Sequence, residues 1–119
     1  MDQIAPIKPN ITHDELEKID IRVGTIEVVQ DVLNSDKPVK LIINFGDHKR
    51  SILVGMKKER QDPKSEIEGK QALFGLNLEP RKIAAEMSEG MIFDIGYSDK
   101  IIPVLALPEK PIPHGARAG

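Results

Sequence analysis

The sequence predicts an all-β domain, a small barrel of five or six short strands, and three observations support this. Short apolar runs rich in β-branched residues recur along the chain, separated by clusters of Gly, Pro, Asn and Asp. Helix-start signals are confined to two short segments. Glycines lie inside the apolar runs, where they commonly mark the bends of a barrel. The 119 residues are enough for one hydrophobic core and not for two.

The first predicted element is a short helix. Thr12, with Glu15 three residues later, has the form of a capping box, in which each side chain accepts a hydrogen bond from the other residue's backbone N–H. We expect this helix to end near Lys18, with Leu16 and Ile19 facing inward together.

Strands are predicted wherever apolar residues alternate or run together between turn signals. The six segments are residues 19–29, 39–45, 50–56, 71–78, 90–95 and 100–107. Gly46 and Asp47 predict a tight hairpin turn between the second and third strands. Pro103 places the last strand at an edge or a bulge.

A second short helix is predicted between the third and fourth strands. Asp62 is the expected N-cap, Pro63 takes the first helical position, and Gly69 ends the helix. Short strands with one helix at this place best match the oligonucleotide/oligosaccharide-binding (OB) fold, a five-stranded barrel. On the strand pattern alone, another small β-domain such as an SH3-like barrel fits equally well.

Charge is segregated along the chain, although the net charge is only −2. Residues 37–60 hold seven cations and two acidic residues, a net charge of +5, which leaves −7 for the rest. The cations are Lys37, Lys40, Lys49, Arg50, Lys57, Lys58 and Arg60. This distribution fits either one basic face on an acidic body or a solvated strand face and turn.

The composition argues against several classes of protein. Cys is absent, which excludes disulfides, thiolate zinc sites and Cys nucleophiles and fits a reducing compartment. His13, His48 and His114 are not at metal-ligand spacing, and no phosphate-binding Gly-rich loop occurs. We therefore expect a non-enzymatic protein with no metal and no cofactor. No apolar run has the length of a signal peptide or a membrane helix, so we expect a soluble cytoplasmic protein without a membrane partner.

The most informative segment is residues 77–91, which connects two predicted strands. A plain hairpin connection would be short and rich in Gly or Asn. This one is long and carries the adjacent cations Arg81 and Lys82 together with a Pro, a Ser and two Met. Loops held by a rigid sheet are where binding residues concentrate. With only three Phe and one Tyr the chain lacks a base-stacking platform, so this loop suits phosphate and ribose contacts on a folded RNA.

Several motifs resemble those of the small tRNA-binding domain family. They are Lys18–Gly24, Asn77-Leu78, Pro80–Ile83, Ser88–Met91, and Pro108–Pro111 with Pro113 and Gly115. The family includes free-standing tRNA-binding proteins, CsaA-like chaperones and the C-terminal extension of many methionyl-tRNA synthetases. The resemblance implies an OB fold that recognises the outside corner of tRNA without anticodon specificity. It also implies RNA contacts by Asn77, Lys82, Ser88 and Met91.

The candidate RNA-binding residues combine these positions with the basic segment. They are Lys37, Lys40, Lys49, Arg50, Lys57, Lys58, Asn77, Arg81, Lys82, Ser88 and Met91. Other roles remain open for three of them, because Asn77 and Ser88 could cap their own loop and Met91 could pack in the core. Arg22 is expected to anchor an ion pair, with Asp20 or with a C-terminal carboxylate.

Two features depart from the family pattern. Ala85 stands where the family loop usually has Gly, and if this residue must adopt a positive φ it costs about 1 kcal/mol relative to Gly. Residues 36–41, together with Phe45 and Gly46, resemble the CsaA-type subgroup. The sequence therefore leaves open whether the client is RNA or an unfolded polypeptide.

We expect three parts along the chain: an N-terminal extension over residues 1–11, the OB domain over 12–107, and an extended tail over 108–119. Free-standing members of the family are typically homodimers. Ile4, Ile7, Ile11 and Ile112 have no place in a five-stranded core, which makes the two ends candidates for the dimer contact. The alternative is that both ends are disordered.

The leading functional hypothesis is a homodimeric tRNA-binding protein. One alternative is a CsaA-type export chaperone that binds unfolded chains through an exposed apolar surface, with Met56, Met87 and Met91 as candidates. Another is a detached accessory tRNA-binding subunit of an aminoacyl-tRNA synthetase, in particular the methionyl enzyme.

Overall fold

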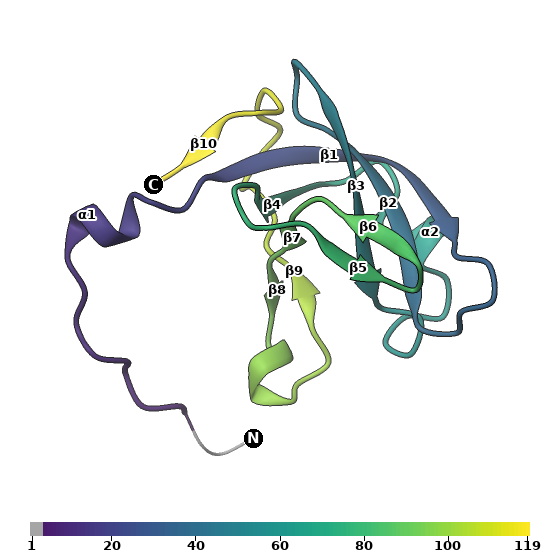
Figure 1. Ribbon diagram of the computed structural model, residues 1–119, viewed down its shortest axis with the longest axis horizontal. Coiled ribbons are helices and arrows are strands. Elements are labelled where there is room, and N and C mark those ends of the chain that lie inside the picture. Colours follow the sequence, from purple (N-terminus) through teal and green to yellow (C-terminus); the bar gives the residue numbers. More distant parts are fainter. Residues whose placement is uncertain (1–3) are drawn as a thin grey trace.

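A computed structural model describes residues 4–119, and Figure 1 shows their arrangement. The main sheet has the strand order β3-β2-β1-β4-β7 and curls into an OB-like barrel. Its elements are β1 (Ile21–Asp31), β2 (Pro38–Asn44), β3 (Lys49–Gly55), β4 (Gln71–Gly75) and β7 (Met91–Ile92), with α2 (Pro63–Ile67) between β3 and β4. The others are α1 (His13–Leu16), β5 (Arg81–Ile83), β6 (Glu86–Ser88), β8 (Asp94–Ile95), the 3₁₀ helix η1 (Tyr97–Asp99), β9 (Val104–Leu105) and β10 (Arg117–Ala118). The predicted all-β class and OB-type fold are confirmed.

The core fills the interior of the barrel. β1, β2 and β3 form an antiparallel meander in which the fully buried Leu41 and Ile52 are directly opposite each other. Phe45 and Phe74 pack edge to face, with ring centroids 5.5 Å apart. Gly24 allows this close packing, because a Cβ at its position would lie 2.6 Å from the Phe45 ring. Gly24 therefore marks a close approach to the backbone, as predicted for a Gly inside a strand.

The seam between β3 and the chain before β7 has no continuous strand ladder. Glu89 N donates to Ser51 O at 2.8 Å, and Ser51 N donates to the Glu89 carboxylate at 2.9 Å. Leu53 N donates to the Ser88 hydroxyl at 3.0 Å. Side-chain oxygens thus take the place of strand carbonyls, and they satisfy backbone donors that burial would otherwise leave without partners.

The first predicted helix forms, but its apolar side is not buried. Glu15 N donates to the Thr12 hydroxyl at 3.1 Å and Thr12 N to the Glu15 carboxylate at 3.2 Å, which confirms the capping box. The expectation that Leu16 faces inward is wrong, because its side chain is 53% exposed. The helix lies away from the barrel, so Leu16 has no barrel residue to pack against (Figure 1).

The second predicted helix is confirmed in its details. Ser65 N donates to the Asp62 carboxylate, Pro63 opens α2, and Ile67 is buried against the barrel. Gly69, just beyond the helix, adopts a φ of +91°, a conformation that favours Gly at a helix end.

The last two predicted strands are shorter than the apolar pattern suggested. Segment 90–95 divides into β7 and β8 at Phe93, whose N–H donates to Leu73 O at 3.1 Å. In segment 100–107 only β9 is a strand, because Lys100 adopts a φ of 60° and closes the tight η1 turn.

The C-terminal tail returns to the barrel. β10 pairs with Ile21 and Arg22 at the start of β1. This part of β1 does not pair with β2, because the β1–β2 pairing begins at Thr25. Gly115 N donates to Val23 O at 2.7 Å, and Val23 N donates to Ala116 O at 2.9 Å. Gly115 has a φ of +92°, and a Cβ there would collide with Phe45 O. The tail therefore adds a strand to the sheet.

The N-terminal arm, described from residue 4 onward, leads away from the barrel (Figure 1). Ile4 and Ile7 are 92% and 97% exposed. No hydrogen bond joins residues 4–11 to the rest of the described chain. Within residues 4–119, no helix is long and apolar enough to cross a membrane.

Candidate nucleic-acid interface

The loop that the sequence singled out contains a β-hairpin of its own. β5 and β6 pair antiparallel, with Lys82 opposite Met87 and Ile83 opposite Glu86. Ala84 and Ala85 form the two-residue turn, with φ values of 49° and 68°. Positive φ at both central residues is the geometry of a type I′ turn, which Asn and Gly normally occupy. The condition under which Ala85 would be costly is therefore met.

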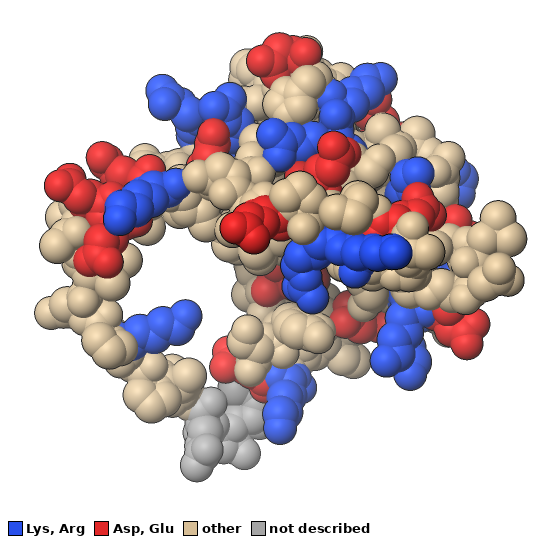
Figure 2. Space-filling model, viewed as in Figure 1, with Lys and Arg blue, Asp and Glu red and all other residues tan. Residues whose placement is uncertain are grey.

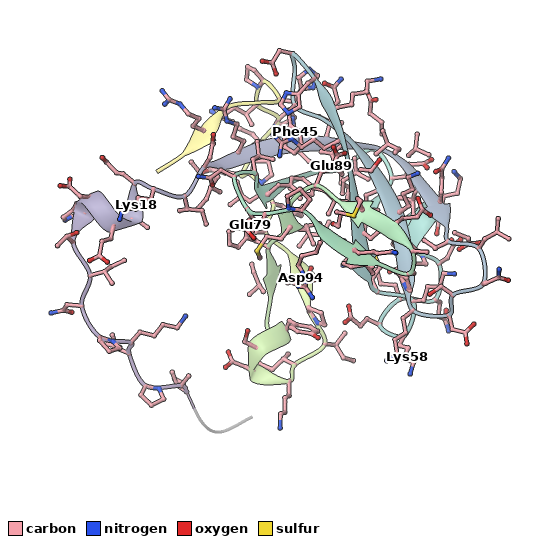
Figure 3. The ribbon with its side chains drawn as sticks, viewed as in Figure 1. Lys18, Phe45, Lys58, Glu79, Glu89 and Asp94 are labelled. Carbon is pink, nitrogen blue, oxygen red and sulfur yellow. The ribbon has the colours of Figure 1, made fainter. Side chains whose placement is uncertain are left out.

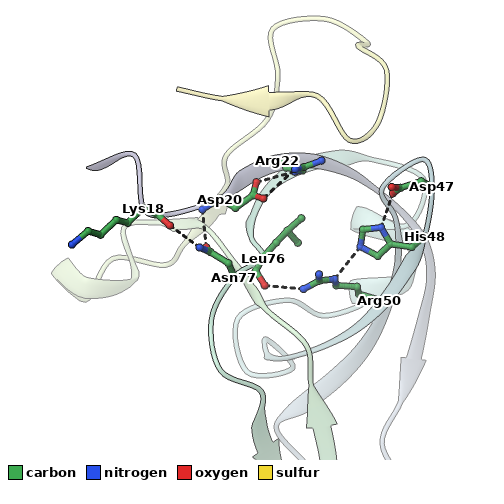
Figure 4. Close-up of polar contacts among 8 residues, drawn as sticks. All are labelled: Lys18, Asp20, Arg22, Asp47, His48, Arg50, Leu76 and Asn77. Carbon is green, nitrogen blue, oxygen red and sulfur yellow. Dashed lines mark hydrogen bonds and ion pairs between the residues drawn. The ribbon is translucent and has the colours of Figure 1, made fainter. Parts of the chain in front are cut away.

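Two of the predicted contact residues hold the loop in place. The Asn77 side chain accepts from Asp20 N at 2.7 Å and donates to Lys18 O at 2.6 Å, so it pairs with the chain entering β1 (Figure 4). The Ser88 hydroxyl, only 3% exposed, accepts from Leu53 N at 3.0 Å and donates to Gly90 O at 3.2 Å. Both side chains are therefore engaged within the protein. Ser88 bonds within its own loop, as the alternative from sequence had it, and also to β3, whereas Asn77 bonds the chain before β1 and not its own loop.

Arg50 fastens both ends of the same loop. Its guanidinium donates to Leu76 O at 2.7 Å, just before the loop (Figure 4). It also donates to Glu89 O at 3.1 Å, just inside the end of the loop. Its Nε donates to His48 Nε2 at 3.0 Å, and His48 Nδ1 lies 2.6 Å from the Asp47 carboxylate. This geometry requires the His48 proton on Nδ1. Sequence reasoning missed this role because the acceptors are backbone carbonyls far along the chain.

Arg22 forms the predicted ion pair with Asp20. Its Nε and Nη2 reach the two carboxylate oxygens at 2.8 and 3.1 Å (Figure 4). The hydrogen bond from Arg22 lowers the pKa of Asp20, and the charges of Arg22, Arg117 and Arg50 act in the same direction. Since Asp20 N also receives the Asn77 side chain, this pair lies at the entry to the loop.

Acids from other segments neutralise much of the basic segment. Each ion pair below joins a cation of residues 37–60 to a carboxylate outside that segment. They are Lys40–Glu86 (3.0 Å), Lys49–Glu27 (2.8 Å), Lys57–Asp31 (3.2 Å) and Arg60–Glu66 (3.1 Å). Basic and acidic atoms accordingly alternate on the face shown in Figure 2. The net charge of +5 on residues 37–60 therefore does not form an uninterrupted basic surface on that face.

Lys37 and Lys58 are the exposed cations of this segment that have no ion pair within the described residues. Lys58 lies at the end of the barrel away from Phe45 and Glu89 (Figure 3). It is therefore remote from the entry to the loop.

The remaining candidates are on the surface of the hairpin and the strand that follows it. Ser88 and Glu86 point toward β3 and β2, so Lys82 and Met87, on the opposite side of the hairpin, face solvent. Arg81 is exposed as well, and Arg81 and Lys82 form no ion pair within residues 4–119. Met91 is 40% exposed, so the core alternative does not hold for its side chain.

The prediction that Met56 belongs to an exposed apolar surface, as a chaperone would need, is wrong. It is 1% exposed and belongs to the core cluster, because it follows β3 into the barrel interior. Of the three Met candidates, Met87 and Met91 are on the surface. Leu78, 42% exposed beside Met91, is an apolar surface residue that the sequence did not single out.

The described residues contain no cluster of three His, Cys, Asp or Glu side chains able to hold a metal ion. The candidate interface is a hairpin in a loop that is anchored at both ends, with Lys82 and Met87 on its free side and Arg81 exposed as well. The family described as "Putative tRNA binding domain" matches residues 21–117. This chain belongs to the tRNA-binding domain family.

Solved structures of related proteins are similar to this chain over most of its length. The MetRS related protein from Pyrococcus horikoshii is 30% identical, with a TM-score of 0.84 over 94% of this chain and 100% of that chain. The CsaA chaperone protein from Picrophilus torridus is 29% identical, with a TM-score of 0.77 over 92% and 100%. The C-terminal domain of Plasmodium vivax p43 is 25% identical, with a TM-score of 0.71 over 87% and 61%. The resemblance drawn from the sequence motifs is confirmed.

Proposed function

We propose that this protein is a non-enzymatic, structure-specific tRNA-binding protein that acts as a homodimer. The observation that carries the proposal is the anchoring of the loop. Arg50 and Asn77 hold its ends, Ser88 seals it to β3, and the hairpin between them presents Lys82 to solvent. A rigid, cation-bearing hairpin suits a folded polyanion, because little ordering entropy is lost on binding.

Lys82 and Arg81 are the proposed primary phosphate contacts, and Met91 is a proposed apolar contact to an exposed base. Lys37 and Lys58 would extend the contact along the RNA backbone. The ion-paired Lys40, Lys49 and Lys57 could contribute as well. Partly exposed pairs of this kind are worth about 0–1 kcal/mol, so a phosphate can replace the carboxylate at small cost.

The test is a titration of labelled tRNA against single-stranded RNA of equal length. We expect tighter binding of tRNA, with log K falling against log salt at a slope of about −3 to −5 if four to six phosphates are neutralised. Equal binding of the two RNAs would refute structure specificity, and binding of neither would refute the function.

The proposed dimer contact combines two apolar features that have no cover within the described chain. One is the N-terminal arm with Ile4, Ile7 and Ile11, and the other is the lobe from β8 to β9. The exposed apolar residues of this lobe are Ile95, Tyr97, Ile101, Ile102 and Val104. Sedimentation equilibrium of a variant with Ser at positions 4, 7 and 11 should give a monomer. Leu33→Ser, which changes an 87% exposed residue elsewhere, should leave the mass unchanged.

The exposed lobe also supports the second candidate, a chaperone that holds unfolded chains, because such clients bind apolar surface. Suppressed aggregation of a denatured client, lost in a Tyr97→Ser and Ile102→Ser double variant, would favour it.

The likeness to a MetRS related protein supports the third candidate, an accessory subunit of a synthetase. Co-purification from cell extract tests that candidate, since it identifies bound RNA, client and synthetase together.

A further inference from the structure

The C-terminal strand brings an arginine next to the loop entry. In the β1–β10 pairing, Arg117 is directly opposite Arg22. Opposite residues on antiparallel strands have Cβ atoms about 5 Å apart, and like charges in this position are destabilising. Such a pair costs stability unless an anion compensates both charges.

The Asp20 carboxylate is hydrogen-bonded by only one of the two arginines. Both oxygens of Asp20 accept from Arg22, at 2.8 and 3.1 Å. Arg117 is exposed and has no ion pair within residues 4–119. The Arg117 side chain is therefore open to solvent in the register opposite Arg22, and no carboxylate of the described residues pairs with it.

This site is continuous with the anchored loop. Asp20 N receives the Asn77 side chain, and Arg50 holds Leu76 O at the start of the loop. Arg22 bonds the Asp20 carboxylate, Arg117 is opposite Arg22 in the sheet, and the charges of all three arginines lower the pKa of Asp20. Figure 4 shows Asp20 and Arg22 beneath β10, with Arg50 on the other side of the loop entry, and Figure 2 shows basic atoms gathered beside β10.

We propose that Arg117 contacts a phosphate of the tRNA backbone, backed by Arg22, so that the RNA-binding surface continues from the β5–β6 hairpin across the loop entry to β10. This inference rests on the proposed function. A guanidinium can donate two parallel hydrogen bonds to a phosphate, and the added negative charge relieves the repulsion between the two arginines. Arg22 positions the Asp20 carboxylate and adds its positive charge to the site, whereas Arg117 makes the contact with the phosphate.

The test compares labelled tRNA binding by the wild type, Arg117→Gln, Arg117→Lys and Lys70→Gln across a salt series. Lys70 is exposed and precedes β4, whereas the loop entry follows β4, so Lys70→Gln provides the same loss of charge outside this surface. Loss of one phosphate contact should make the slope of log K against log salt shallower by about 0.9. Between 200 and 50 mM salt, the affinity gap to the wild type should therefore widen roughly threefold for Arg117→Gln. Arg117→Lys should keep most of the slope, and Lys70→Gln should keep all of it.

Thermal unfolding of each variant shows whether β10 still pairs, and we expect Arg117→Gln to melt no lower than the wild type because the side chain is exposed. An unchanged slope in folded Arg117→Gln would overturn the proposal while the wild type still binds tRNA. An equal change in Lys70→Gln would overturn it too, since that result reports net charge alone. Failure of the wild type to bind tRNA would instead refute the proposed function.

Discussion

Replacing Ala85 by Gly should stabilise the β5–β6 hairpin. Ala84 and Ala85 make the turn with φ values of 49° and 68°, where a Cβ crowds the following carbonyl at a cost of about 1–2 kcal/mol per residue. Gly removes that strain but loses more conformational entropy on folding, about 0.4–1 kcal/mol. Since Ala85 is exposed and its methyl group packs against little, the net gain should be on the order of 0.5–1 kcal/mol.

Urea unfolding provides the first measurement, and amide hydrogen exchange of Lys82 and Met87 the second. The urea midpoint should rise at constant slope, and exchange within the hairpin should slow. Gly69→Ala is the matched reverse change, because Gly69 has a φ of +91° and open space around its Cβ position. It should lower the midpoint by a comparable free energy. A midpoint that falls in Ala85→Gly would refute the claim that this turn is strained.

Three further predictions concern side chains with distinct roles. Ser88→Ala leaves the buried Leu53 N–H without its acceptor and should lower the free energy of unfolding by about 1–3 kcal/mol in urea; an unchanged midpoint would show that another acceptor replaces it. The hydrogen bond from Arg22 lowers the folded-state pKa of Asp20 below its ordinary 3.8, so the pair's stabilisation is present above that value and is lost as pH falls through the folded pKa. Urea midpoints measured from pH 5 downward should therefore depend less on pH in Asp20→Asn than in the wild type, and parallel curves would contradict this. Lys82→Ala should weaken tRNA binding and make the salt slope shallower by about 0.9, whereas a slope that does not change would mean that Lys82 touches no phosphate.

The local elements were predictable from short stretches of sequence. The Thr12–Glu15 capping box and the Asp62-Pro63 helix start each depend on residues a few positions apart, so the chemistry is complete within one turn. The Gly46-Asp47 turn likewise brings Phe45 N to His48 O at 2.9 Å. The lengths of the last strands were less predictable, because most apolar residues after Phe93 are exposed on a lobe, and Leu105 is the exception that reaches the core.

The roles of the site residues depended on partners distant in sequence. Arg50 reads as a strand cation, yet it bonds Leu76 O and Glu89 O, 26 and 39 residues away. Lys40 reads as a free cation until the hairpin brings Glu86 to within 3.0 Å. No local pattern encodes such pairings, since they exist only after the sheet has formed.

By itself, the sequence determined the β-rich class, the two helix starts and the motifs by which the chain belongs to the tRNA-binding domain family. These rest on backbone preferences and spacing that operate between near neighbours. Only the tertiary structure decided which side chains anchor the loop and which remain on the surface. It assigned Asn77 and Ser88 to anchoring, placed Lys82 outward, and set Arg117 beside Arg22. The physical reason is that hydrogen bonds and ion pairs across the barrel are specified by strand register, which a single segment does not contain.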